Sequence, residues 1–316
     1  MQTLSIKLFT FLIAGAAILT ALFFLVRQNL TPQQKQSDNR LSVVTTLYPL
    51  YDFTREVGKD LVRVTLLLPP GTEPHAFEPK PADIVTINQT DVFIYTGKFM
   101  EVWAEDLLDG IPNKTLKIID ASSGITLFPA GSHDEDKQVG SNDPHIWLDF
   151  GNAQAMVNTI AAGLAQKDPA NKAVYLANAA SFSERLHQLD EEYKRVLATC
   201  KTRKIVYGGH YAFGYLAKRF GLTYVAAQGI SPNAEPTAHD LATLVEQIKV
   251  DAITSVFYEE LTSPKIAETL AKETGTRMLS LNAAHNVTKQ DLEAGVTFVS
   301  VMEENLAHLT TGLACR

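Results

Sequence analysis

The sequence predicts an α/β protein of two lobes, each with a mainly parallel β-sheet flanked by helices, joined by one long rigid helix. Three observations lead to this prediction. Strand-like and helix-like segments alternate in both halves of the chain, which is typical of βαβ units. A helical stretch of about thirty residues, and therefore about 45 Å long, separates the two halves. At 316 residues the chain also exceeds what one hydrophobic core usually serves.

The alternation in the N-terminal half begins at Leu41. We expect strands at 41–47, 62–68, 92–95 and 116–120, and helices around 52–58, 80–90, 100–108 and 153–166. The second of these helices opens with an amphipathic pattern at Pro81. Residues 128–142 interrupt the alternation before it resumes.

The long helix is predicted at 169–199. Asp168 and Pro169 supply an N-cap and a proline at the first helical position. The apolar side chains recur at three-, four- and seven-residue intervals, as one buried face of a helix requires: Tyr175, Phe182, Leu186, Leu189, Tyr193 and Leu197. A helix of this length is best explained as a rigid connection between two domains.

The C-terminal half repeats the alternation. We expect strands at 204–207, 223–227, 252–258 and 277–281, helices at 211–220, 238–249, 264–274 and around 291–309, and a turn at 231–236. The predicted organisation is a membrane anchor or signal at 1–30, a polar tether at 31–40, an N-terminal lobe at 41–168, the linking helix at 169–199 and a C-terminal lobe at 200–316.

The N-terminal segment predicts export. Residues 8–26 are 19 uncharged residues between Lys7 and Arg27, about the length that spans a bilayer. No small-residue cleavage site follows, so an uncleaved anchor is favoured over a cleaved signal peptide. We expect an extracytoplasmic protein, tethered to the cell membrane through residues 8–26 or periplasmic after cleavage. No cysteine lies near the segment for lipidation.

The charge distribution limits the partners. Residues 31–316 contain 26 basic and 35 acidic side chains, a net charge of −9. An acidic chain without a Lys/Arg cluster is not expected to bind nucleic acid, and it suits a cationic ligand. Cys200 and Cys315 are too few for a thiolate metal site, and in an exported protein they could form one disulfide, which the sequence leaves open.

Four histidines recur at the ends or turns of strand-like segments. These histidines, spread over more than two hundred residues, are His75, His145, His210 and His285. Taken singly, each is as well explained by a turn or a helix start. Together they indicate a metal site, because the carboxyl ends of parallel strands meet in one crevice and neutral imidazole is the commonest metal ligand. An all-imidazole set favours zinc, copper or nickel over manganese or magnesium.

The remaining histidines have simpler explanations. His187 lies on a polar stretch of the long helix, and His239 and His308 lie near helix ends, where we expect structural roles. His133 belongs to an acidic segment, 131–136, for which two interpretations stay open. It is a solvated surface loop, or a loop that collects metal weakly beside the main site.

Several segments resemble the metal-binding substrate-binding proteins of ABC transporters, especially their zinc-specific branch. The matching segments are PHAFEPKPADI, DPHIWLD, GGHYAFGYLAKRFGL, SPNAEPTAHDL and LSLNAAHNVTKQDLEAGVTFVSVMEENLAHL. They follow one another in the family's order from Leu41 to the C-terminus. The resemblance implies two α/β lobes with the metal held between them, and delivery of that metal to a membrane permease. We expect a monomer.

The resemblance also implies a ligand set. His75, His145 and His210 are similar to the three histidine ligands of the zinc branch, whereas manganese-binding relatives have a carboxylate in place of His210. At the fourth position the chain departs from the family, because it has Asn282 with His285 three residues later, where some zinc binders have asparagine and glutamate. The preferred hypothesis is a four-histidine Zn²⁺ site, and the competing one is three histidines and a water.

Glu259 resembles an acid that orients a ligating ring from behind, and Asn282 is assigned to the same supporting layer. The leading hypothesis is a zinc carrier rather than an enzyme. Two alternatives are a manganese or iron carrier of the same fold and, from another class, a zinc hydrolase with three histidines and a metal-bound water. The sequence leaves open whether copper or nickel competes with zinc.

Overall fold

The computed structural model describes residues 39–129, 142–230, 236–259 and 261–316. The predicted membrane segment at 8–26, nearly all of the tether, the acidic segment with His133 and most of the turn at 231–236 lie outside these ranges. Within them, no helix is both long and apolar enough to cross a bilayer. Residues 40–316 form one compact unit.

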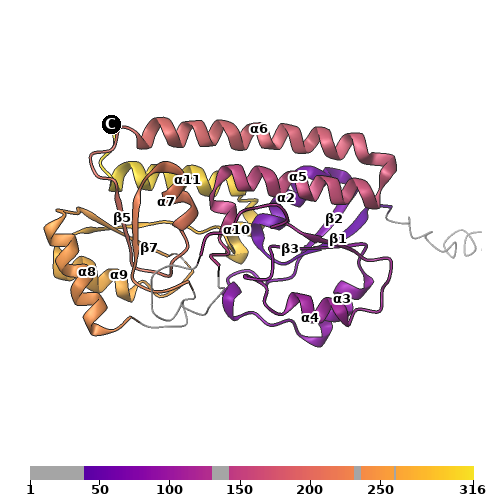
Figure 1. The fold of residues 1–316 in the computed structure, drawn as a ribbon, viewed down its shortest axis with the longest axis horizontal. Coiled ribbons are helices and arrows are strands. Elements are labelled where there is room, and N and C mark those ends of the chain that lie inside the picture. The colour runs from indigo at the N-terminus through magenta and orange to yellow at the C-terminus, as the bar shows by residue number, and fades with distance from the viewer. Residues whose placement is uncertain (1–38, 130–141, 231–235, 260) are drawn as a thin grey trace, which may run out of the picture. The chain divides into compact units, whose positions relative to one another are not determined.

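The two-lobe α/β architecture predicted from the sequence is confirmed (Figure 1). Each lobe contains a four-stranded sheet, with strand orders β2-β1-β3-β4 and β6-β5-β7-β8, and every strand pair in both sheets is parallel. In the first sheet β1 pairs with β2 in a register that runs from Leu41 opposite Val62 to Thr45 opposite Leu66. The two sheets have the same order of strands, so their carboxyl ends present equivalent loops.

The N-terminal lobe comprises the elements up to α5. Its strands are β1 (Leu41–Thr45), β2 (Val62–Leu66), β3 (Val92–Tyr95) and β4 (Lys117–Asp120). Its α-helices are α2 (Tyr48–Gly58), α3 (Pro81–Gln89), α4 (Ala104–Asp109) and α5 (Phe150–Lys167). Short 3-10 turns are η1 (Lys59–Leu61), η2 (Pro74–Ala76) and η4 (Ile146–Leu148).

The linking helix α6 (Lys172–Leu197) follows the 3-10 turn η5 (Pro169–Asn171). Its 26 residues correspond to about 39 Å of helix. The helix extends along both lobes, with α5 and α11 between it and the sheets (Figure 1). The apolar residues predicted for its buried face are all buried.

The C-terminal lobe has strands β5 (Lys204–Tyr207), β6 (Thr223–Ala226), β7 (Ser255–Tyr258) and β8 (Arg277–Ser280). Its helices are α7 (Gly214–Phe220), α8 (Ala238–Val250), α9 (Lys265–Thr274), α10 (Lys289–Ala294) and α11 (Phe298–Gly312). A disulfide between Cys200 and Cys315 joins the end of the linking helix to the C-terminal segment, which resolves the pairing that the sequence left open.

The largest hydrophobic cluster extends through both lobes. It joins residues of α2, α5, α6 and α11, and at its centre the ring of Phe53 packs 5.7 Å from Phe182 and 5.0 Å from Phe298, measured between ring centroids. Separate clusters lie under α3 and α4 and under α8 and α9. The lobes are therefore held together by a shared core as well as by α6.

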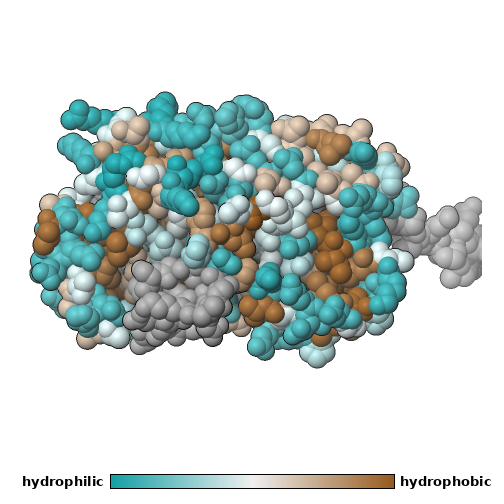
Figure 2. Space-filling model, in the orientation of Figure 1, coloured by the Kyte–Doolittle hydropathy of each residue, from teal (hydrophilic) through white to brown (hydrophobic). Residues whose placement is uncertain are grey.

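Hydrophilic residues cover most of the face seen in Figure 2. The exposed large hydrophobic side chains of the described ranges are spread over several elements: Ile84, Val85, Val102, Ile118, Val174, Leu176 and Val250.

Several helix boundaries differ from those predicted. The expected helix at 291–309 is two helices, because Gly295 adopts a left-handed backbone conformation (φ +75°) that ends α10, and Thr297 caps α11. Helix α7 begins at Gly214 rather than at 211, so His210 lies in a loop and not at a helix start.

The starts of two further helices, α5 and α6, also differ from those predicted. Helix α5 begins at Phe150, because Asp149 accepts hydrogen bonds from the backbone N–H groups of Gly151 and Asn152. The Asp168 carboxylate does not cap α6, because it accepts hydrogen bonds from the side chains of Asn171 and Tyr175 instead.

Candidate metal centre

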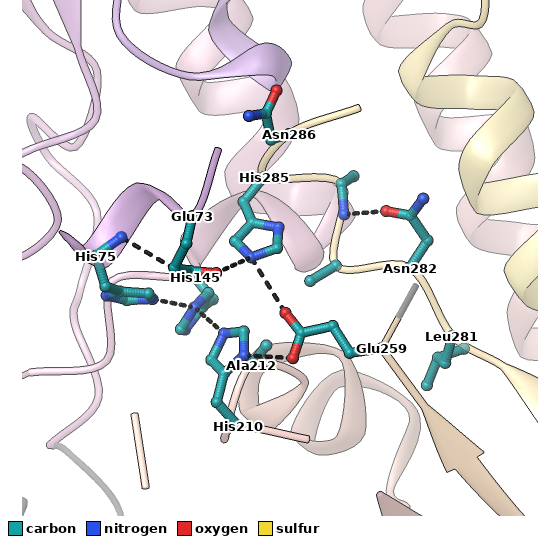
Figure 3. A network of polar contacts seen from close by, with 12 residues as sticks. Glu73, His75, His145, His210, Ala212, Glu259, Leu281, Asn282, His285 and Asn286 are labelled. Atoms are coloured by element: carbon teal, nitrogen blue, oxygen red, sulfur yellow. Dashed lines mark hydrogen bonds and ion pairs between the residues drawn. The ribbon is translucent and has the colours of Figure 1, made fainter. Parts of the chain in front are cut away.

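Four histidines from both lobes lie close together in one buried site (Figure 3): the ring nitrogens of His75, His145 and His210 form one group, and His285 forms a second with His210 and Glu259. His145, His210 and His285 are fully buried, and His75 is partly buried. The ring centroids of His75, His145 and His210 lie 5.2–5.3 Å from one another, and the ring of His285 lies 5.4 Å from that of His210. The loops that carry them follow strands of both sheets, as expected for ligands held at the carboxyl ends of parallel strands.

His75 lies in the 3-10 turn η2, in the loop between β2 and α3. Pro74 begins this turn, and the Glu73 side chain accepts a hydrogen bond from the His75 backbone N–H at 3.0 Å. The turn places the imidazole Nε2 3.2 Å from Nε2 of His145. The neighbouring residues Glu73 and Pro74 therefore determine the backbone turn that orients the His75 side chain.

His145 is oriented by Asp143, which is almost fully buried. One carboxylate oxygen, Oδ1, accepts hydrogen bonds from both the backbone N–H (3.0 Å) and the Nδ1–H (2.8 Å) of His145. Trp147 follows in η4, and its ring lies 5.5 Å from the His145 ring, between centroids. Because Nδ1 carries the hydrogen that Asp143 accepts, Nε2 is the unprotonated nitrogen of this ring and has a lone pair.

His210 follows two glycines, which allow neighbouring residues to approach the backbone closely. A Cβ on Gly208 would lie 2.6 Å from Cβ of Ala267, and one on Gly209 would lie 2.8 Å from a carboxylate oxygen of Glu259. The missing side chains allow Glu259 Oε2 to accept a hydrogen bond from His210 Nδ1 at 2.9 Å. His210 Nε2 then faces His145 Nε2 at 3.2 Å.

The contact between these two Nε2 atoms points to a cation. Both rings use Nδ1–H to donate to a carboxylate, so both Nε2 atoms present lone pairs to one another at 3.2 Å. Two lone pairs repel each other unless a proton or a metal lies between them. Four nitrogens placed 2.0–2.1 Å from a tetrahedral zinc would be about 3.3 Å apart, close to the observed separations. The donors therefore fit zinc in both chemistry and spacing.

His285 adjoins this trio but has a different environment. Its Nε2 lies 3.4 Å from Glu259 Oε1 and 3.8 Å from Glu73 Oε2, which are ion-pair rather than hydrogen-bond distances. Neither nitrogen of the ring has a hydrogen-bond partner. Before it, Ala284 has a left-handed backbone (φ +56°), and Asn282 Oδ1 accepts a hydrogen bond from the Ala284 N–H at 2.6 Å. Asn282 thus supports the turn that directs His285.

The electrostatics match this arrangement. Burial and the positive charge of neighbouring rings hold the pKa values of His75 and His145 well below their usual range, so these rings are neutral and able to bind metal. For His285, burial lowers the pKa, but the facing carboxylates of Glu259 and Glu73 outweigh it and raise the pKa. Burial would raise the pKa of Glu259, whereas the adjacent histidines hold it well below its usual value.

Sequence reasoning identified the four histidines and Glu259 as one group, and the structure brings all of them together. It missed two carboxylates, Asp143 and Glu73. Both lie two residues before a ligand-type histidine and bond its backbone N–H, a local pattern that the sequence already contained. His187 lies on α6 beside Asp190, away from this site, and Asp190 is already bound by Arg219 and Lys194.

Comparisons with known proteins agree with this chemistry. The family described as ZnuA, zinc-uptake complex component A (periplasmic), matches residues 43–312. The chain is 39% identical over 300 residues to the zinc-binding lipoprotein AdcA of Streptococcus pneumoniae, which covers 93% of this chain but 59% of AdcA. It is 34% identical over 312 residues to the high-affinity zinc uptake system protein ZnuA of Bacillus subtilis, covering 95% of this chain and 97% of that protein.

A solved structure supports the same relationship. The Zn(II)-bound ZnuA-like domain of S. pneumoniae AdcA aligns with a TM-score of 0.75 at 38% sequence identity, covering 87% of this chain and 99% of that domain. The chain therefore corresponds to one part of AdcA and to almost the whole of the Bacillus protein.

Proposed function

This chain belongs to the zinc-uptake complex component A family, and from that premise we propose that it captures Zn²⁺ outside the cytoplasm and delivers it to an ABC-type membrane permease. Zinc is the cargo, and the protein has no catalytic step. The observation that carries the proposal is the pair of lone-pair-bearing Nε2 atoms, on His145 and His210, that face one another at 3.2 Å in a buried site.

The proposed ligands are His75, His145, His210 and His285. The first three supply Nε2 atoms whose separations suit a tetrahedral ion, and His285 lies beside His210, which belongs to the same lobe. Asp143 and Glu259 hold two of the rings in the ligating tautomer, and each carboxylate makes its ring a stronger donor. Four nitrogen ligands without a carboxylate select against manganese.

Capture requires neutral rings, which burial favours at His75 and His145, whereas His285 has to give up a proton that Glu259 and Glu73 stabilise. Release follows when docking to the permease disturbs the ligand set, which comes from loops of both lobes. The chain acts as a monomer held at the membrane by residues 8–26, so that the lobes stay close to the permease.

A zinc titration of the full chain in detergent tests the proposal, with a competing chelator and with Mn²⁺, Cu²⁺ and Ni²⁺ as competitors. We expect one tight zinc site that is nearly abolished in His75→Ala and much weakened in His285→Ala. The exposed His239, on α8, supplies the matched control, and His239→Ala should bind zinc as the parent does. Preference for manganese would overturn the proposed cargo.

The role of His285 is tested separately. If His285→Ala binds zinc as tightly as the parent, the fourth ligand is not this histidine, and the site has three histidines and another donor. The zinc-carrier proposal would survive that result, whereas the four-histidine ligand set would not.

A further inference from the structure

The loop that carries His285 is attached to the N-terminal lobe, although its sequence belongs to the C-terminal lobe. The backbone N–H of Tyr48 donates to the His285 carbonyl at 3.3 Å, and that of Gly71 donates to Val287 at 2.9 Å. The indole N–H of Trp147 donates to the Ala283 carbonyl at 2.8 Å. Three separate segments of one lobe thus hold this loop of the other.

Asn286 makes the side-chain part of this attachment. It is fully buried, and its amide group donates to the backbone carbonyls of Pro69 (2.9 Å) and Thr72 (2.8 Å), which lie 217 and 214 residues away in the sequence. Its Oδ1 accepts from the Val287 N–H at 2.8 Å. Both amide hydrogens and the oxygen are therefore used, and all three bonds lie within the two loops (Figure 3 shows the residue above His285).

We propose that Asn286 is a positioning residue of the metal site, which ties the His285 loop to the His75 loop and so sets the separation of two ligands from different lobes. This inference rests on the proposed zinc function. Thr72 is three residues before His75, and His285 immediately precedes Asn286, so both bonds act within one turn of a ligand. If the amide were removed, the Thr72 carbonyl would lose this donor, whereas the Pro69 carbonyl would keep only the backbone N–H of Thr72, at 3.1 Å.

The consequence for binding follows from geometry. The His285 ring has only the longer ion-pair contacts with Glu259 (3.4 Å) and Glu73 (3.8 Å), so its position depends strongly on the backbone of its loop. The left-handed turn at Ala284 fixes one side of that backbone, and Asn286 fixes the other. Removal of a group that supports a metal ligand from behind typically weakens metal affinity 10- to 100-fold.

The test compares Asn286→Ala and Asn286→Asp with the parent, all as full chains in detergent. The aspartate keeps the acceptor for Val287 but places a carboxylate against two carbonyl oxygens. Asn178→Ala is the matched control, because it also deletes an amide-to-carbonyl bond (to Val57, 2.9 Å), between α6 and α2 and away from the site. Zinc dissociation constants, the visible spectrum of the Co²⁺ form and the melting temperature are measured for each.

We expect both Asn286 variants to bind zinc 10- to 100-fold more weakly and to show a Co²⁺ spectrum altered in the same way as that of His285→Ala. Amide exchange at Gly71, the donor to Val287, should become faster. Asn178→Ala should lower the melting temperature without changing zinc affinity or the spectrum. If Asn286→Ala does not fold, Asn286→Asp decides the question.

Parent-like zinc affinity and Co²⁺ spectrum in the Asn286 variants would overturn the positioning role, even if their melting temperatures fall. That result leaves zinc binding by the parent, and hence the proposed function, intact. If the parent chain shows no zinc site, or if the His75→Ala variant binds zinc as tightly as the parent does, the proposed function fails and this inference fails with it.

Discussion

Glu259→Gln gives the sharpest test of how the buried carboxylates serve the metal site. Glu259 is 2% exposed, and its two oxygens face two different histidines, His210 Nδ1 at 2.9 Å and His285 Nε2 at 3.4 Å. Glutamine has nearly the same shape and can still accept from His210, so the substitution removes the negative charge and little else. The amide N–H₂ would then face His285.

The expected loss can be estimated from these contacts. A charge-assisted hydrogen bond is roughly twice as strong as a neutral one, and a carboxylate behind a ligating histidine raises the basicity of the ring. We expect zinc affinity to fall 10- to 100-fold, or about 1.4–2.7 kcal/mol. His285 should also lose most of the stabilisation of its protonated form, because Glu73, at 3.8 Å, becomes its remaining carboxylate neighbour.

The assay is a chelator-competition titration of parent, Glu259→Gln and Glu246→Gln at one pH and ionic strength. Glu246 lies on the exposed surface of α8 and controls for the loss of one negative charge from the whole protein. Equal zinc affinities in the parent and Glu259→Gln would refute the argument that the carboxylate tunes His210. An equal loss in Glu246→Gln would show that net charge, rather than this contact, is responsible.

Three further predictions concern stability. Reduction, or Cys200→Ser with Cys315→Ser, should lower the free energy of unfolding by up to about 4–5 kcal/mol in denaturant titrations, because the disulfide closes a loop with a sequence separation of 115. Burial raises the pKa of Glu101 to about 7, so between pH 4.5 and 7 the folded chain keeps a proton that the unfolded chain loses. Stability should therefore fall as pH rises through that window, by about 3 kcal/mol from this group, and Glu101→Gln should show a flatter profile. Arg219→Met should lower the free energy of unfolding by about 2–3 kcal/mol, because the buried Asp190 carboxylate loses its bonds of 2.6 and 2.7 Å to the guanidinium and keeps its contact with Lys194, at 2.8 Å.

Each of these has a clear contrary result. Unchanged denaturation midpoints after reduction would mean that the cross-link does not restrict the unfolded chain. A Glu101→Gln profile parallel to that of the parent would assign the pH slope to other groups. Arg219→Met with parental stability, or an equal loss with the exposed Arg195→Met, would show that the Asp190 contact contributes little.

The fold class could be predicted from the sequence because local patterns decide element type. Strand-like runs such as 62–66 and the apolar periodicity of 172–197 depend on residues a few positions apart, and both produced the expected elements. Boundaries were less well predicted where a cap or a backbone conformation decides them. Gly295, with φ +75°, divides the last predicted helix, and the hydrophobic pattern on either side gave no sign of the break.

The four histidines could be named from the sequence because each follows a strand, and parallel strands bring their carboxyl ends to the same edge of a sheet. The partners of these histidines divide into two kinds. Asp143 and Glu73 are two residues from their histidines, so a local turn determines their bonds. Glu259 is 49 residues from His210, and only the pairing of β5 with β7 brings them together.

By itself the sequence determined the alternating α/β elements, the long helix, the apolar N-terminal segment and a set of histidines suited to zinc. The tertiary structure alone decided that Cys200 pairs with Cys315, and that Asn286 bonds to carbonyls more than two hundred residues away. The physical reason is the range of the interactions. Propensity and periodicity act over a few residues, whereas a backbone carbonyl is the same acceptor at every position, and only packing of the two lobes selects which one a buried amide meets.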